Sequence, residues 1–413
     1  MRKFLKTLGP GIVVAATGVG AGDMIAASVA GAKYGTIIIW AAVAGAVFKF
    51  FLNEGIARWQ LATDTTLIEG WNHKFHPAVS WYFTGYLFLW GFIVAGALIA
   101  ACGLAAHAIF PFLSVNAWGI IHSMLALLLV YFGRYRLVEQ LMKFFIGLMF
   151  LVVCSSAILI GPDWGGILKS LAVPRLPSGS AMFILGVIGG VGGSVTLLSY
   201  GYWIREKKWI GKEYSGRVRL DLAAAYVLTG LFGAAIMIVA AGVKPGVITG
   251  SKMVIALAER LGTVVGPVGK WIFLTGFWGA VFSSMVGVWQ GVPYLFADTV
   301  NARNTRNTRK DKTVRISESA VDVRSRHYLF FLFYLAVPPL SLLFLGKPVW
   351  VVIIYSVTGA FFMPFLAALL LIMNNKWGWV KEFKNRLLIN LVLWAALILF
   401  AVLCINEVLQ RFF

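Results

Sequence analysis

The stretch LGPGIVVAATGVGAGDMIAASVAGA, residues 8–32, decides how the chain is built. It is an apolar run of helical length, but Gly18, Gly20 and Gly22 interrupt it and a single carboxylate, Asp23, follows. Glycine weakens a helix, and lipid makes unsatisfied backbone and buried charge expensive. Two interpretations remain. One is a glycine-lined helix contact with Asp23 in a polar pocket. The other is a helix broken in mid-membrane, whose bared backbone and Asp23 bind a solute or an ion.

The rest of the chain has the composition of a helical membrane protein. Its 413 residues are 60% hydrophobic and only 13% charged, with a net charge of +20. The basic residues lie mostly in short loops between apolar segments, as membrane topology requires. We therefore predict a lipid bilayer as partner and no nucleic acid. The three cysteines lie within apolar segments and form neither a disulfide framework nor a metal-binding spacing.

Eleven segments have the length and hydropathy of membrane-spanning helices, so we predict an all-α polytopic membrane protein. They are residues 10–31, 35–57, 79–109, 115–132, 137–161, 180–202, 219–241, 267–296, 327–345, 349–373 and 387–408. Alternate loops carry 25 and 9 basic residues. This bias predicts a multi-pass protein of the plasma (inner) membrane, with a cytoplasmic N-terminus and the C-terminus outside.

A second glycine-interrupted span matches the first. Residues 181–205, AMFILGVIGGVGGSVTLLSYGYWIR, break around Gly190 and Gly193, and Thr196 follows. No strand pattern precedes these glycines and no P-loop lysine follows, which excludes a phosphate loop. Paired broken spans at matching positions of two halves indicate an inverted-repeat transporter site, which carbonyls at both breaks would line together with Thr196 and Asp23. We expect one transmembrane domain over 1–413, with repeats at 8–161 and 178–373 and an extra helix at 387–408.

Polar residues inside two other predicted spans also need an explanation. Ser283 and Ser284 either bond to the preceding helical turn or supply oxygen ligands to a hard cation such as sodium. The second span carries four polar residues toward its predicted cytoplasmic end, where we expect their charges to reach water. These are Lys49, Asn53, Glu54 and Arg58.

These features resemble the natural resistance-associated macrophage protein (Nramp) family of metal-ion transporters. The resemblance covers most of the chain and rests on Gly9-Pro10-Gly11, the broken first span, residues 57–70, the break in the sixth span and Ser283-Ser284. It implies a leucine-transporter-like fold of five plus five inverted spans plus extras. It also implies movement of manganese, iron or similar divalent ions with protons.

The chain departs from the family at the expected metal site. The family's Asp-Pro-Gly-Asn signature falls on Gly20-Ala21-Gly22-Asp23, and Met-Pro-His falls on Gly193-Ser194-Val195. The acidic pair that the family often carries in its third span is absent from residues 90–100. One carboxylate, backbone carbonyls and hydroxyls remain, and this set suits a hard ion such as sodium, magnesium or a proton.

Our main hypothesis is a secondary active transporter of cations in which Asp23 binds the metal or couples the proton. The alternative is a sodium-coupled transporter of a small organic solute, with Ser283 and Ser284 holding the sodium. A membrane receptor or assembly subunit with a vestigial pore is a third hypothesis. We expect no enzyme activity and no cofactor, because the sequence shows no set of nucleophile, base and orienting group.

Overall fold

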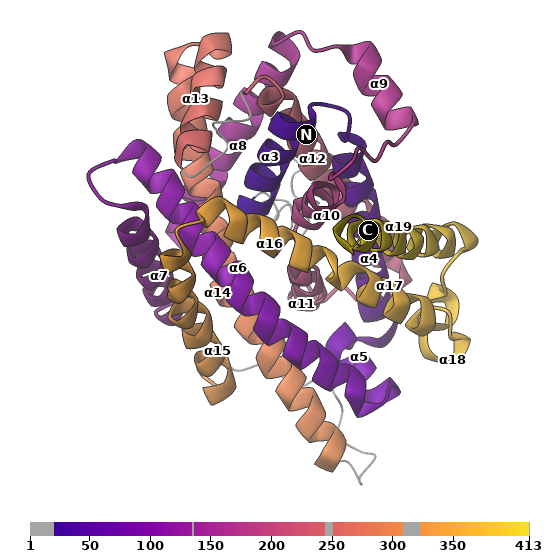
Figure 1. The fold of residues 1–413 in the computed structure, drawn as a ribbon. Coiled ribbons are helices and arrows are strands. Elements are labelled where there is room, and N and C mark those ends of the chain that lie inside the picture. Colours follow the sequence, from indigo (N-terminus) through magenta and orange to yellow (C-terminus); the bar gives the residue numbers. More distant parts are fainter. Residues whose placement is uncertain (1–19, 134–135, 244–250, 309–322, 413) are drawn as a thin grey trace.

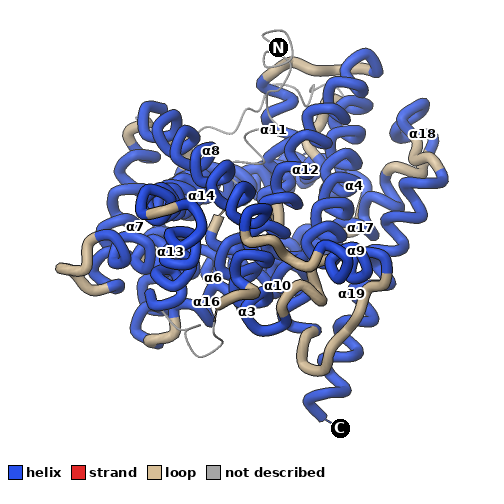
Figure 2. The backbone as a smooth tube through the Cα atoms, turned by 90° about the horizontal axis from the view of Figure 1, so that it is seen from above, coloured by secondary structure: helices blue, strands red, loops and turns tan. Residues whose placement is uncertain are grey.

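Every regular element in the described part of the chain is a helix (Figure 1, Figure 2). The structure is a computed structural model that describes residues 20–133, 136–243, 251–308 and 323–412. The first half of the chain comprises η1 (Gly22–Ala26), α3 (Ala27–Tyr34), α4 (Trp40–Thr63), α5 (Leu67–Lys74), α6 (Pro77–Ile109), α7 (Val115–Tyr131), α8 (Arg136–Leu159) and α9 (Trp164–Ala172). The predicted all-α class is confirmed.

The second half continues in the same way. It comprises α10 (Ala181–Gly190), η2 (Val195–Leu198), α11 (Ser199–Glu206), η3 (Lys212–Tyr214), α12 (Ser215–Ala240), α13 (Ser251–Val265), α14 (Pro267–Thr308), α15 (Arg326–Ala336), η6 (Pro338–Leu345), α16 (Pro348–Ala360), α17 (Phe362–Met373), α18 (Trp377–Val380), η7 (Lys381–Phe383) and α19 (Leu387–Phe412). Helices cover most of the described residues of the predicted spans, and α5, α9, α13 and α18 are shorter helices between them.

Six described helical segments are long and apolar enough to cross a membrane, or up to eight if each of two bent pairs is one span. The bent pairs are Ile146–Leu159 with Trp164–Ala172 and Trp377–Phe383 with Leu387–Leu403. Three further predicted spans are not among these. The first begins outside the described residues, α4 carries charged side chains, and α7 has only 17 residues. The total of eleven spans stays a prediction.

Local chemistry explains where one predicted span is divided into two helices. The tenth predicted span divides into α16, which ends at Ala360, and α17, which begins at Phe362. Pro364 stands in the first turn of α17. A proline ring collides with the carbonyl four residues earlier, and for Pro364 that carbonyl belongs to Ala360. The helix therefore ends at Ala360 and restarts in a position that tolerates proline.

The long helices α6 and α14 pack against each other, with α7 and α15 on one side of the molecule and α17 and α19 on the other (Figure 1). Aromatic rings join α6, α14 and α15: Phe88 contacts Phe296 and Phe331 with centroids 5.4 and 5.1 Å apart. The helices α4, α10, α12 and α16 form the centre of the bundle. This arrangement places the interrupted span α10–α11 in the interior.

The structure corrects the prediction that the polar residues of the second span reach water. Lys49 and Asn53 are 0% exposed, and Glu54 and Arg58 are each 5% exposed. The reason is that α4 packs against α10, α12, α17 and α19, which cover most of the surface of these side chains. Buried polar groups then need partners within the protein, and Glu54 forms an ion pair with Arg58.

Candidate functional site

The sixth predicted span is interrupted inside the bundle, as its glycines indicate. α10 ends at Gly190, and Gly192 and Gly193 have φ angles of +74° and +81°. Residues with a Cβ rarely adopt this conformation, so glycine is required at both positions. The 3-10 turn η2 and helix α11 then resume the span. The last carbonyls of a helix have no helical partner and carry the negative end of its dipole, so the end of α10 favours a cation.

The first glycine-interrupted segment lies against this break. A Cβ on Gly22 would lie 3.1 Å from the Cα of Gly190 and 3.1 Å from Cε1 of Tyr355. Gly20 is buried, and its carbonyl accepts a hydrogen bond of 3.1 Å from the amide of Met24. The two segments that the sequence pairs are therefore neighbours in the structure.

Two of the predicted site residues on this segment are not placed fully. Gly18 lies outside the described residues. Asp23 belongs to η1, a single π-helical turn, but its side chain lies outside the described part of the structure. The role of Asp23 as a metal ligand therefore stays a prediction.

Lys49 of α4 brings an ammonium group to the break. Its Nζ donates a 2.9 Å hydrogen bond to the carbonyl of Gly189 and a second hydrogen bond to the carbonyl of Val191. A buried ammonium is expensive in a membrane protein, and the carbonyls at the negative end of α10 offset that cost. These carbonyls therefore bind a cation that the protein itself supplies.

The sequence interpretation missed Lys49 as a site residue, although a signal was present. Lys49 lies among apolar residues well inside the predicted span 35–57. An ionisable side chain within a span is by default a candidate functional residue. For Lys49, this position inside the span was a better guide than the general tendency of long basic side chains to reach the membrane surface.

Asn53, one turn further along α4, extends this polar set. Its Nδ2 donates a 3.0 Å hydrogen bond to the hydroxyl of Tyr226 on α12. The Tyr226 ring in turn lies against the break, where a Cβ on Gly192 would be 2.9 Å from Cε1 of the ring. Asn53 and Tyr226 therefore line the same region that Lys49 reaches.

Three buried polar atoms in this region have no hydrogen-bond partner among the described residues. They are Oδ1 of Asn53, Oγ of Ser194 and Nε1 of Trp90. Ser194 and Trp90 both lie next to Gly359, 2.8 and 3.5 Å from the Cβ position of that glycine. Leaving such atoms unpaired costs free energy unless water or a ligand bonds to them. The region around the break is therefore suited to binding water or a polar ligand.

Small residues allow the backbones to meet so closely. A Cβ on Gly189 would lie only 2.0 Å from the carbonyl oxygen of Ser356 on α16. A Cβ on Gly45 of α4 would lie 3.1 Å from the Cα of Ile188 on α10. These contacts hold α10 between α4 and α16, which fixes the end of the helix opposite Lys49.

The remaining predicted site residues lie near the break or on α14. Thr196 is half-buried in η2, and its Oγ1 is 2.6 Å from the Cβ position of Gly193. Ser283 donates a 3.0 Å hydrogen bond to the carbonyl of Ala280, which is the intrahelical alternative. Ser284 is buried on the same helix. The proposed sodium site at the two serines stays a prediction.

The donor chemistry of the region is dominated by oxygen. Among the described residues, no group of three or more His, Cys, Asp or Glu side chains is arranged to hold a metal ion. The break offers main-chain carbonyls, the Asn53 amide, and the Ser194 and Tyr226 hydroxyls. Oxygen ligands of this kind suit hard cations rather than soft ones.

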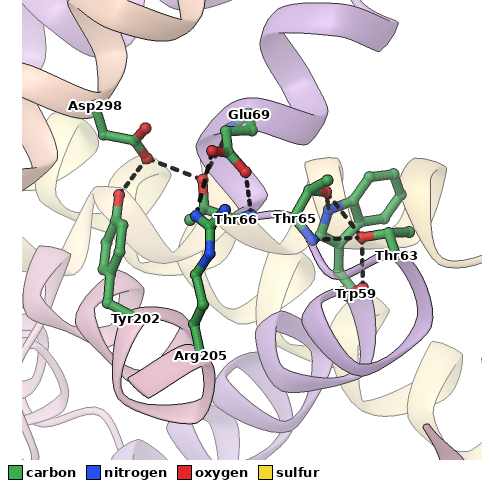
Figure 3. A network of polar contacts seen from close by, with 8 residues as sticks. All are labelled: Trp59, Thr63, Thr65, Thr66, Glu69, Tyr202, Arg205 and Asp298. Atoms are coloured by element: carbon green, nitrogen blue, oxygen red, sulfur yellow. Dashed lines mark hydrogen bonds and ion pairs between the residues drawn. The ribbon is translucent and has the colours of Figure 1, made fainter. Parts of the chain in front are cut away.

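A second polar cluster joins α5, α11 and α14 (Figure 3). Thr66 and Glu69 form a capping box at the start of α5, with the Thr66 amide 2.8 Å from Oε2 of Glu69. Asp298 of α14 accepts hydrogen bonds from the hydroxyls of Thr66 and Tyr202, the former at 2.9 Å. Arg205 of α11 lies 3.3 Å from Oε1 of Glu69. The cluster therefore ties α11, which follows the break, to α5 and α14.

Glu69 lies on α5, between the predicted spans 35–57 and 79–109. Burial raises the pKa of Glu69 to about 7, and the nearby charge of Asp298 contributes to the rise, while Arg205 and the Thr66 amide oppose it. Glu69 therefore changes its charge near neutral pH. A change of charge at this point acts on the contact between α5 and α11.

Comparison with known protein families gives a match over most of the chain. The family described as natural resistance-associated macrophage protein-like (Nramp) matches residues 11–410. The divalent metal cation transporter MntH of Caldanaerobacter subterraneus subsp. tengcongensis is 24% identical over 406 residues, covering 93% of this chain and 88% of that protein. The MntH of Bacillus subtilis is 25% identical over 309 residues, 70% of each chain.

Solved structures give the same picture of the fold. A mutant of the manganese transporter of Eremococcus coleocola superposes with a TM-score of 0.70 at 16% identity, covering 98% of this chain and 86% of that one. MhsT in complex with L-phenylalanine superposes with a TM-score of 0.57 at 15% identity, covering 96% and 98%. At these identities the likeness concerns the fold alone. The predicted fold class is thus confirmed, whereas the limits of the two repeats stay a prediction.

Proposed function

Because the chain belongs to the natural resistance-associated macrophage protein-like (Nramp) family, we propose that it is a secondary active transporter that moves metal cations across a membrane. The proposal is supported by the relatives named divalent metal cation transporter and by the fold shared with a manganese transporter. The transporter would lie in the plasma (inner) membrane with its N-terminus in the cytoplasm, as the distribution of basic residues predicts.

One observation carries the proposal: the end of α10 already binds a cationic group. The carbonyls of Gly189 and Val191 accept hydrogen bonds from the Lys49 ammonium. Gly22, from the segment that contains Asp23, lies against the same turn. Carbonyl oxygens that stabilise an ammonium in the protein interior are chemically able to bind a metal cation in its place.

The donors favour a hard cation as cargo. Magnesium and manganese accept carboxylate, carbonyl and hydroxyl oxygens, whereas softer metals gain from sulfur and imidazole. The described residues around the break supply oxygen donors, and Asp23 would add one carboxylate. A cation that reaches the carbonyls of Gly189 and Val191 must also displace Lys49, so this side chain would compete with the cargo.

Uptake into proteoliposomes tests this function. We would measure the flux of manganese and of magnesium for the wild type and for Asp23→Asn. Losing the carboxylate of the site should weaken cation binding by about 1.4 kcal/mol or more, and so lower the flux at subsaturating metal at least about tenfold. Asp64→Asn is the matched control, because Asp64 has φ +55° at the end of α4, a conformation that asparagine tolerates. Equal flux in wild type and Asp23→Asn would contradict the role of Asp23, and no flux of either metal would contradict the function.

A further inference from the structure

A separate pocket of about 110 Å³ lies on the side of α4 that carries Glu54 and Arg58. It is bounded by α4, by the start of α12 and by the segment that leads from η7 into α19. Five basic side chains line it: Arg58, Lys212, Arg219, Lys384 and Arg386. The cation site at the α10 break uses none of these residues.

The charges that line this basic pocket do not balance. Its carboxylates are Glu54 and Glu382, so five positive charges face two negative ones. Glu54 is shared between Arg58 and Arg219, the latter at 3.1 Å, and Glu382 pairs with Lys212 at 2.8 Å. Neither Lys384 nor Arg386 forms an ion pair with a described residue. The pocket therefore keeps an excess of positive charge.

The arginines of the basic pocket are also positioned close to one another. Nη1 of Arg58 donates a 2.9 Å hydrogen bond to Oδ1 of Asn385, which fixes the buried guanidinium beside the segment that carries Lys384 and Arg386. Arg219 and Arg386 lie close enough to repel the charge of Arg58. A bound anion would remove this repulsion. Guanidinium groups form paired hydrogen bonds to phosphate oxygens, and lysine adds a point charge.

The rim of the pocket adjoins exposed apolar side chains. Arg386 is followed directly by Leu387 and Leu388, which are 75% and 63% exposed at the start of α19. Trp377 of α18 is also exposed, and tryptophan is enriched where a membrane meets water. A phosphate group in the pocket would thus have apolar side chains beside it that suit acyl chains. Basic pockets between helices bind anionic head groups in this manner.

The geometry points to a binding site for a phosphate-bearing anion at this pocket, with the head group of an anionic phospholipid as the occupant that the neighbouring leucines favour. Arg58 and Arg219 hold the inner side of the phosphate, and Lys384 and Arg386 close over it. Occupation links α4 and α12 to the extra helix α19. The site stands on its own charges and neighbours and does not depend on which solute the protein transports.

The test is a binding measurement on the purified full-length chain. Native mass spectrometry would count bound phosphatidylglycerol and phosphatidylcholine, and calorimetry on lipid-depleted protein would titrate inorganic phosphate. The pocket variant is Lys384→Gln with Arg386→Gln, two exposed side chains whose loss should spare the fold. The control is Lys74→Gln with Lys376→Gln, which removes two charges that contact Trp379 outside the pocket.

We expect wild type and control to bind phosphatidylglycerol in preference to phosphatidylcholine, and the pocket variant to bind it about tenfold or more weakly, because charged hydrogen bonds are lost. Saturable binding of inorganic phosphate that the pocket variant loses, without discrimination between lipids, would also support the site and assign it to free phosphate. Equal phosphatidylglycerol and phosphate binding by the pocket variant and the wild type would overturn the proposal. Absence of both ligands from the wild type would overturn it equally.

Discussion

Lys49 is the residue on which the account of the site depends. A fully buried ammonium needs acceptors, and the structure supplies them at the interrupted helix end that α4 reaches. In the proposed transporter, the same carbonyl oxygens would be ligands of the transported cation. Lys49 therefore stabilises the break, and in the proposed transporter it would compete with the cargo. Such competition would affect selectivity, because only a strongly bound cation would displace the ammonium.

The competition predicts a gain of binding on substitution. Lys49→Met keeps a long unbranched side chain and removes the charge, so the affinity for magnesium should rise about tenfold or more. Isothermal calorimetry at a single pH measures this. Lys169→Met, an exposed position on α9, is the control and should bind magnesium as the wild type does. If Lys49→Met bound magnesium no better than the wild type, Lys49 would not be a competitor of the cargo.

At the scale of elements, the break between α10 and α11 divides a span into a part held by α4 and α16 and a part tied to α5 and α14. The cluster of Thr66, Glu69, Tyr202, Arg205 and Asp298 makes the second of these connections (Figure 3). An α11 that must move for cargo to leave would have to break these contacts. The charge of Glu69 acts directly on one of them, the ion pair with Arg205.

This cluster predicts a dependence of stability on pH. Because the pKa of folded Glu69 is raised to about 7, its protonated form is favoured by folding. The contribution of Glu69 to stability is full below its ordinary pKa of 4.5 and is lost as the pH rises to about 7. Asp298, Arg205, Tyr202 and Thr66 are the groups that face it, and Arg205 moderates the loss.

The variant Glu69→Gln should remove this dependence, because glutamine resembles the protonated acid at every pH. Above about pH 7 it should be more stable than the wild type by ~1–3 kcal/mol. Thermal unfolding followed across the range from about pH 5 to pH 8 gives the comparison. Glu259→Gln, an exposed carboxyl on α13, serves as control. A pH slope that survives in Glu69→Gln would assign the titration to another group.

Across the whole molecule, the long apolar helices and the interrupted helix were predictable because a bilayer allows few backbone structures. Backbone groups in lipid must bond within helices, so a long apolar stretch indicates a helix. Gly192 and Gly193 indicate the break in the sequence, because glycine readily adopts the positive φ angles that both residues have in the structure. The two glycine-interrupted segments were expected to pair because of their matching positions in the chain, and the approach of Gly22 to Gly190 makes these segments neighbours.

The polar partners could not be predicted in the same way. Lys49 and Asn53 were expected at the water surface, and only the packing of α4 against α10 and α12 shows that they point inward. The apolar runs define each helix but not which face meets a neighbour. The sequence left two alternatives for Ser283, a bond to the preceding helical turn or a ligand for a cation. In the structure its hydroxyl donates a hydrogen bond to the carbonyl of Ala280.

The proposed transporter binds its cargo where α10 ends. Crystals of the purified protein soaked in manganese, with anomalous diffraction recorded at a wavelength where manganese scatters, test it most directly. We expect one strong anomalous peak beside the carbonyls of Gly189 and Val191 and next to Gly22, with the Lys49 ammonium moved away from both carbonyls. A peak elsewhere in the bundle, with Lys49 still bonded to Gly189 and Val191, would contradict it.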